Sequence, residues 1–229
     1  MKKLIFILLF FTGLTNPVLK AQIILPDQEV AQIFNAAVKT QFNLQYPIFR
    51  VYKYIDKAGM FYTVLTESRD SIGQKKDTFS FKIKAVTLKN ENGKLSKTWE
   101  LSDAADKTKK GEKAIWFWSK YADFKDLDND AITDPIIVYG TEGQNHYEYG
   151  RLGIAIFYKG QKVMVRQQNG TLDIERKLQI EKPFYSLPQQ VQSAVIEKMK
   201  LLAKKWQAIF PLDWEKAMAQ KKTVINGKN

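Results

Sequence analysis

The sequence contains no cysteine and only one histidine among its 229 residues. Disulfide bonds, thiolate metal ligands, Cys–His catalytic pairs and zinc sites with two histidines are therefore excluded. A lipid anchor on an N-terminal cysteine is excluded for the same reason. The one histidine, His146, lies in a polar and aromatic stretch bounded by glycines, and we expect it in an exposed loop. No G-x-S-x-G motif is present to support a serine hydrolase that would use it.

Long hydrophobic runs are also missing after the start of the chain. Residues 4–11 (LIFILLFF) form an apolar run that follows Lys2 and Lys3 and precedes polar residues and Ala21. This run is far shorter than the ~20 residues that span a bilayer, and the pattern is typical of a secretory signal peptide. We therefore expect residues 1–21 to be a signal peptide. The rest would be exported to the periplasm or the medium, without a transmembrane segment.

Linkers and repeats are absent as well. No stretch rich in proline, glycine and serine divides residues 22–229, and no segment of the sequence is repeated. A hydrophobic content of 45% and an aromatic content of 13% argue against disorder. A chain of this length buries a sizeable core without disulfide bonds. We expect one domain over 22–229, with a frayed tail after Lys221.

Acidic residues are scarce relative to basic ones. The 24 Asp and Glu residues face 36 Lys and Arg residues, which gives a formal charge of +12. The lysines are scattered, which is typical of a solvated surface, but a basic protein also favours acidic partners. Because export is expected, anionic polysaccharide or another cell-surface component is the expected partner, and nucleic acid is not. The sequence carries no signal for an oligomeric state.

Short apolar segments separated by turns dominate the middle of the chain. Hairpin turns are expected at 56–59, 90–94 and 159–162. The strands expected around these turns and after them are 48–55, 60–67, 79–88, 95–101, 136–139, 152–158 and 163–167.

Two helices are expected at the ends of the domain. The first covers residues 28–42 after a cap at Asp27, and the second follows a capping box that pairs Ser186 with Gln189. The second helix carries an apolar stripe made of Val191, Val195, Met199, Leu202, Trp206 and Ile209. The expected fold class is α+β. It consists of one largely antiparallel, meandering sheet of about six to nine strands. The C-terminal amphipathic helix covers this sheet, and the N-terminal helix is a second candidate cover.

The densest group of acidic residues is the segment DLDNDAITD at 126–134. Calcium takes oxygen ligands from a curled loop, in which side chains at alternate positions converge. Asp126, Asp128 and Asp130 occupy alternate positions, Ile132 would add a backbone carbonyl, and Asp134 stands two residues further on. Four carboxylates this close repel one another without a cation. The alternative is an acidic turn whose side chains accept backbone hydrogen bonds.

An EF-hand is excluded, because Ile137 stands where that motif has its bidentate glutamate and a strand follows instead of a helix. Residues 124–138 resemble the calcium loops of FG-GAP (integrin α-propeller-like) repeats, F-x-D-x-D-x-D-G-x-x-D. The resemblance implies that Asp126, Asp128, Asp130 and Asp134 bind calcium. Ala131 replaces the glycine of that motif, at a position that favours positive φ, which puts the affinity in doubt. A propeller needs several repeats, so its fold is not implied.

The chain as a whole resembles small exported proteins of Bacteroidota-type bacteria. The features that carry this resemblance are the leader ending in Ala-Gln, the lysine-rich composition and the single aspartate loop before a strand.

Other residues have weaker functional signals. Trp116 and Trp118 would share one face of a strand with Phe117 on the other, and core packing is favoured over sugar stacking. Three arginines could form an anion site or pair with nearby acids, namely Arg151, Arg166 and Arg176. The carboxylates available for glycoside hydrolysis are Glu148, Asp173 and Glu175, and none is singled out by its context.

The expected function is that of an exported, non-enzymatic binding protein with one structural calcium ion and no catalytic residues. The first alternative is a calcium-supported enzyme acting on cell-surface or dietary polysaccharide. A cleft with two carboxylates about 5–10 Å apart would favour this alternative. The second is a membrane-surface module that uses the basic C-terminal helix, and burial of the stripe through Leu202 and Trp206 would argue against it.

Overall fold

The structure, a computed structural model, describes residues 22–73, 78–106, 108, 111–143 and 147–228. The expected signal peptide at 1–21 and His146 lie outside the described residues. Strands account for 43% of the described residues and helices for 24%.

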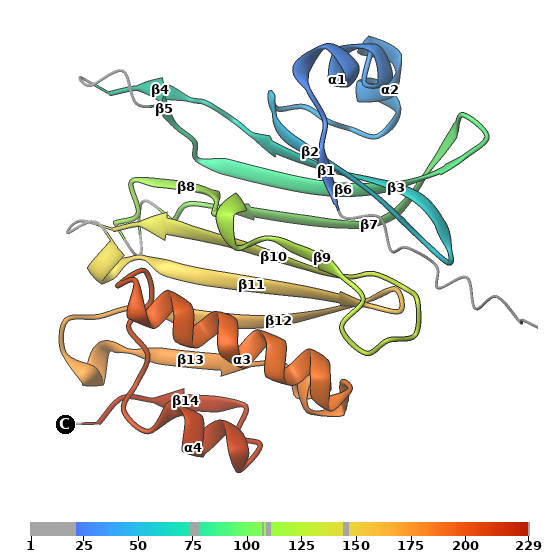
Figure 1. Ribbon diagram of the computed structural model, residues 1–229. Coiled ribbons are helices and arrows are strands. Elements are labelled where there is room, and N and C mark those ends of the chain that lie inside the picture. Colours follow the sequence, from blue (N-terminus) through green and yellow to red (C-terminus); the bar gives the residue numbers. More distant parts are fainter. Residues whose placement is uncertain (1–21, 74–77, 107, 109–110, 144–146, 229) are drawn as a thin grey trace, which may run out of the picture.

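Two large antiparallel sheets lie face to face (Figure 1). The first has five strands in the order β1-β2-β3-β6-β7: Ile23–Ile24, Ile48–Asp56, Gly59–Glu67, Lys82–Glu91 and Lys94–Ala104. The second has seven strands, six of them in the order β14-β13-β12-β11-β10-β8: Val224–Asn226, Lys177–Ile180, Gln161–Gln168, Arg151–Tyr158, Asp134–Glu142 and Ala114–Phe117. Its seventh strand, β9 (Asp123–Lys125), also pairs with β10. A two-stranded ribbon pairs β4 (Ser71–Ile72) with β5 (Thr78–Phe79).

In the described part of the chain, four α-helices lie outside the two sheets. They are α1 (Asp27–Ile33), α2 (Ala36–Gln41), α3 (Gln189–Lys204) and α4 (Trp214–Ala219). Short 3-10 helices form at η1 (Ser119–Tyr121), η2 (Tyr147–Tyr149), η3 (Asp173–Glu175) and η4 (Lys182–Ser186). Helices α1 and α2 lie over the first sheet, and α3 lies along the second (Figure 1).

The predicted α+β class is wrong, because the fold is mostly β and two large sheets replace the single helix-covered sheet. The reason is visible in β10, whose residues Ile136 to Tyr139 are apolar at every position. Alternate side chains of a strand point to opposite faces. Ile136 and Val138 therefore join the core beneath α3, whereas Ile137 and Tyr139 join the core between the sheets. Both faces of the second sheet need a cover, and the first sheet covers one of them.

The three hairpins predicted from turn residues are confirmed. β2 pairs with β3, β6 with β7, and β11 with β12, each across the expected turn. Glycine makes these turns possible at Gly93 and Gly160, where φ is 88° and 79°. The tail after Lys221, predicted to fray, instead forms β14 and pairs with β13.

The predicted helices differ from the observed ones at their ends. The single helix expected at 28–42 is divided, because Phe34 is fully buried under the first sheet and Asn35 starts a new helix. The Asn35 side chain accepts a hydrogen bond from the Val38 N–H at 3.1 Å. Helix α3 begins after Pro188, so Ser186 does not cap it.

The apolar stripe of α3 is confirmed at Val191, Val195, Met199 and Leu202, all of which are buried. Trp206 does not continue this stripe. It lies beyond the end of α3 with φ of 56° and is 79% exposed.

Candidate metal centre

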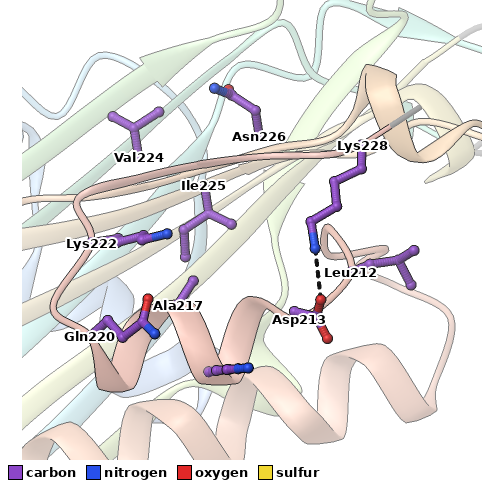
Figure 2. A pocket seen from close by; sticks show the side chains of 10 residues that line it. Leu212, Asp213, Ala217, Gln220, Lys222, Val224, Ile225, Asn226 and Lys228 are labelled. Atoms are coloured by element: carbon purple, nitrogen blue, oxygen red, sulfur yellow. Dashed lines mark hydrogen bonds and ion pairs between the residues drawn. The ribbon is translucent and has the colours of Figure 1, made fainter.

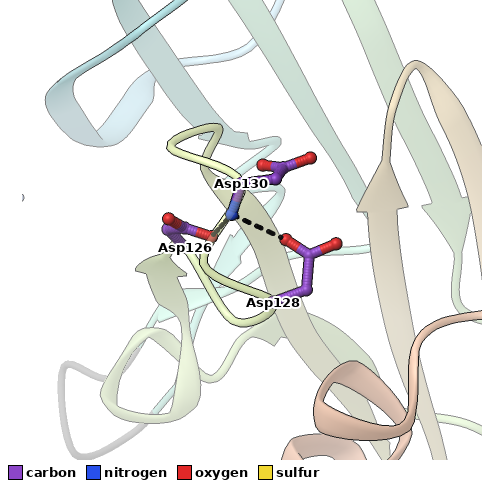
Figure 3. Close-up of side chains that lie close together, drawn as sticks. All are labelled: Asp126, Asp128 and Asp130. Atoms are coloured by element: carbon purple, nitrogen blue, oxygen red, sulfur yellow. Dashed lines mark hydrogen bonds between the residues drawn. The ribbon is translucent and has the colours of Figure 1, made fainter.

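The aspartate segment forms the loop that connects β9 to β10. These strands pair antiparallel, with Lys125 opposite Asp134, and this pairing closes the base of the loop. Within the loop, Asn129 and Ala131 adopt left-handed backbone conformations with φ of 63° and 68°. The two reversals curl the chain, and the curl places the Asp126 and Asp128 carboxylates on either side of the Asp130 N–H, which donates to both (Figure 3).

Three of the predicted carboxylates converge. Asp126, Asp128 and Asp130 each offer a carboxylate oxygen, and these oxygens lie within 4.8 Å of one another (Figure 3). All three residues are partly buried. A compact set of carboxylate oxygens has the chemistry that hard divalent cations such as calcium prefer. Asp134 is not one of the three converging carboxylates, although it lies at the base of the same loop.

The same carboxylates also hold the loop backbone. Asp126 accepts hydrogen bonds from the N–H groups of Asp130 at 3.1 Å and Ala131 at 2.8 Å. Asp130 accepts one from the Ile132 N–H at 2.9 Å. The acidic-turn alternative predicts these bonds, and the metal hypothesis predicts the convergence. The loop has both features, and each carboxylate retains oxygen lone pairs beyond those used by the backbone.

The loop contacts the tips of two hairpins. From the β11–β12 hairpin, the Tyr158 hydroxyl donates to Asp128 at 2.8 Å, and the Lys159 ammonium pairs with Asp130 at 2.8 Å. From the β2–β3 hairpin, the Lys57 N–H donates to the Ala131 carbonyl at 2.9 Å. Because β2 and β3 belong to the first sheet and β11 to the second, the loop links both sheets.

Burial and neighbouring charges shift the pKa values of two loop aspartates, Asp134 and Asp130, in opposite directions. The pKa of Asp134 is raised to about 6, first by burial and then by the charges of the other three aspartates, against the Leu127 N–H bond, which lowers it. The bond from Lys159 lowers the pKa of Asp130, and Asp130 in turn raises the pKa of Lys159. The loop thus contains one carboxyl group that resists ionisation and one that already has a cationic partner. Sequence reasoning missed Lys159, because nothing in a lysine at a hairpin turn indicates a distant aspartate.

The three arginines singled out in the sequence form ion pairs. Arg151 pairs with Asp103 and Glu112, Arg166 with Glu181, and Arg176 with Asp173. The pairing alternative is therefore confirmed over a shared anion site.

Two of the three carboxylates considered for glycoside hydrolysis, Asp173 and Glu175, hold backbone N–H groups. Asp173 accepts hydrogen bonds from the N–H groups of Leu212 and Lys228, and Glu175 accepts one from the Leu172 N–H. Glu148 is exposed in η2.

The predicted aromatic arrangement is confirmed, since Trp118 is buried beneath α3, Trp116 packs on the same core, and Phe117 faces the other sheet.

Comparisons with known proteins add no functional assignment. Within the described residues, none of the helices combines the length and the apolar character that crossing a bilayer requires. Searches against protein-family models, curated proteins and solved structures find no match to this chain.

Proposed function

We propose that this protein is an exported, non-enzymatic binding protein whose loop at 126–134 binds one calcium ion. The observation that carries the proposal is the convergence of Asp126, Asp128 and Asp130 within 4.8 Å. Ionised carboxylates at this separation repel one another, and a divalent cation removes that repulsion. Calcium, rather than a smaller ion, is proposed because the loop resembles FG-GAP calcium loops. The same resemblance assigns Asp134 as a further ligand, and the position of Ile132 in the loop suggests its carbonyl as another.

The ion would have a structural role. The loop already contacts the Lys57 backbone of one hairpin and the Tyr158 and Lys159 side chains of another. Fixing the three aspartates would therefore also fix these two hairpin tips relative to β10. Because ions that bind only the folded state stabilise it by mass action, calcium should raise the melting temperature.

The enzymatic alternative receives no support from the pocket beside the loop. This pocket of about 340 Å³ lies between the hairpin tips, and its described lining includes Tyr54, Trp99 and Phe157. Asp56 is the one carboxylate among the described lining residues, and both Asp56 oxygens accept backbone hydrogen bonds, from Ala58 and Thr133. Glycoside hydrolysis generally needs two carboxylates that face each other across the cleft. An aromatic lining with one engaged carboxylate is suited to binding.

The test is calorimetric titration of calcium into protein freed of metal with EDTA, with a thermal melt at each step. The test variant is Asp128→Asn, Asp130→Asn. The matched control is Asp27→Asn, Glu29→Gln, which makes the same change in charge on an exposed helix. Wild type and control should bind one calcium with a Kd of about 10⁻³ M or tighter and melt at a higher temperature. The test variant should do neither.

Two results would overturn the proposal. The first is a wild-type protein that shows neither binding heat nor a change in melting temperature. The second is a test variant that binds calcium as the control does. In either case the segment would be an acidic turn.

A further inference from the structure

A second candidate site lies at β14, an edge strand of the second sheet. Strands β13, β12 and β11 lie between β14 and β10, the strand that follows the aspartate loop. There, a pocket of about 420 Å³ opens between helix α4 and strand β14 (Figure 2). The helix forms one wall and the strand the other (Figure 2). The polar side chains that line it are Asp213, Lys216, Gln220, Lys222, Asn226 and Lys228. These residues are exposed, so a ligand can reach them from solvent.

The pocket has an excess of positive charge. Its three lysines face one aspartate, and Asp213 pairs with Lys228 at 2.8 Å. Within the described residues, Lys216 and Lys222 form no salt bridge, although the charge of Lys216 adds to that of Lys228 in lowering the pKa of Asp213. Two ammonium groups besides the Lys228–Asp213 pair therefore line the same pocket, and this excess of positive charge favours an anionic ligand.

The rest of the lining indicates what else the ligand carries. The Gln220 side-chain amide offers hydrogen-bond donors and an acceptor, which suit hydroxyl groups. Leu212 adds apolar surface and is 60% exposed. Val224 and Asn226 contribute to the β14 wall, but their side chains point to the face of the strand away from α4 (Figure 2). A pocket of about 420 Å³ is within the size range of sites for small organic ligands. Charge, hydroxyl groups and apolar C–H faces occur together in acidic sugars.

We infer that this pocket binds an acidic oligosaccharide, a sugar chain that carries carboxylate or sulfate groups. The inference deepens the proposed function, on which it rests, by naming the ligand class of the binding protein. It does not depend on calcium, because the pocket shares no residue with the loop at 126–134.

The test is calorimetric titration of two acidic probes, trigalacturonate for carboxylates and a sulfated disaccharide for sulfates. Maltotriose is the neutral control, and inorganic phosphate controls for charge alone. The pocket variant is Lys216→Gln, Lys222→Gln. The matched variant is Lys204→Gln, Lys205→Gln, which removes two exposed lysines at the end of α3. Every titration is run in EDTA and repeated on the Asp128→Asn, Asp130→Asn protein.

At least one acidic probe should bind the wild type, and the stronger probe identifies the anionic group. Its affinity should fall about tenfold or more in the pocket variant and stay within about twofold in the matched variant, because only the former removes charges at the site. Maltotriose should not bind. The loop variant should keep the affinity, so loss of calcium binding alone leaves the inference intact.

Three results would overturn the inference. One is the absence of binding by both acidic probes. Another is an equal loss of affinity in the pocket and matched variants, which would mean diffuse attraction to a basic surface. The third is phosphate binding as tightly as the acidic sugars.

Discussion

At the scale of single residues, Ala131 departs from the backbone conformation that an L-residue prefers. Its φ of 68° confirms the positive φ expected from the glycine of the FG-GAP motif. For an L-residue this conformation costs about 1 kcal/mol or more. The surroundings hold the residue there, because its N–H donates to Asp126 and its carbonyl accepts from Lys57.

Replacing Ala131 by glycine tests this strain. Ala131→Gly should leave the free energy of unfolding unchanged or raise it by up to about 1 kcal/mol, because relief of strain offsets the greater entropy of the unfolded chain. The control is Ala31→Gly in α1, an exposed position inside the helix where the loss should be about 0.5–1 kcal/mol. Urea unfolding in EDTA measures both. A loss at position 131 equal to that at position 31 would refute the strain.

Asp134 gives the loop a pH dependence. Its folded pKa of about 6 lies above the ordinary value of 3.8, so the folded state holds the proton more tightly than the unfolded chain. Its contribution to stability is therefore present below pH ~4 and is lost as the pH rises through ~6.

Asp134→Asn should remove this dependence. In EDTA, the variant should gain roughly 1–2 kcal/mol over wild type between pH ~4 and ~7, since its amide can still accept from Leu127 without a charge. Melting curves of both proteins are recorded across this pH range. The difference in stability between the two proteins at each pH measures the effect, because the titration of all other groups is common to both. If the stabilities of the two proteins change in parallel with pH, Asp134 does not titrate in this range.

At the scale of elements, prediction succeeded where the signal is local. The three hairpins were predictable because turn residues and the strands beside them are adjacent in sequence. The break between α1 and α2 was not, because it depends on the burial of Phe34 against the first sheet. Trp206 continued the helical period of α3 in sequence, yet the helix ends before it. Periodicity shows which face of a helix is apolar and leaves the end of the helix undetermined.

The packing of α3 can be tested with two adjacent leucines. Leu202 is fully buried, whereas Leu201 is 43% exposed. Leu202→Ala should lower the free energy of unfolding by about 2–5 kcal/mol, because it leaves a cavity beneath the helix. Leu201→Ala should cost less than about 1 kcal/mol, because water already contacts that side chain. Urea unfolding compares the two, and similar losses would contradict the docking of α3 on the second sheet.

At the scale of the whole molecule, a network of ion pairs joins the two sheets in addition to their apolar packing. Arg151 on β11 donates to both oxygens of Asp103 on β7, at 2.6 and 3.0 Å. Its Nε donates to Glu112 at 2.8 Å, and Glu112 also accepts from the Thr141 hydroxyl. Burial alone would raise the pKa of Asp103, but the hydrogen bond and charge of Arg151 outweigh it and lower that pKa.

This network lay beyond sequence reasoning. The sequence allowed Arg151 to pair with some acid, but its partners are 48 and 39 residues away. They meet only because two sheets stack, and the stacking was itself missed when a single sheet was expected. The convergence of Asp126, Asp128 and Asp130 was predictable, because the three residues lie within one short segment of the chain. The contacts that attach the loop to both sheets were not.

Arg151→Met should therefore destabilise the whole molecule. Removing the arginine leaves Glu112, whose side chain is fully buried, without its charged partner, and the expected cost is about 3–5 kcal/mol. The control is Arg166→Met, whose pair with Glu181 is 49% and 38% exposed and should be worth less than about 1 kcal/mol. Urea unfolding is followed by tryptophan fluorescence and circular dichroism together. Because the sheets share one core, both probes should shift together in Arg151→Met. Equal losses in the two variants would mean that apolar packing alone joins the sheets.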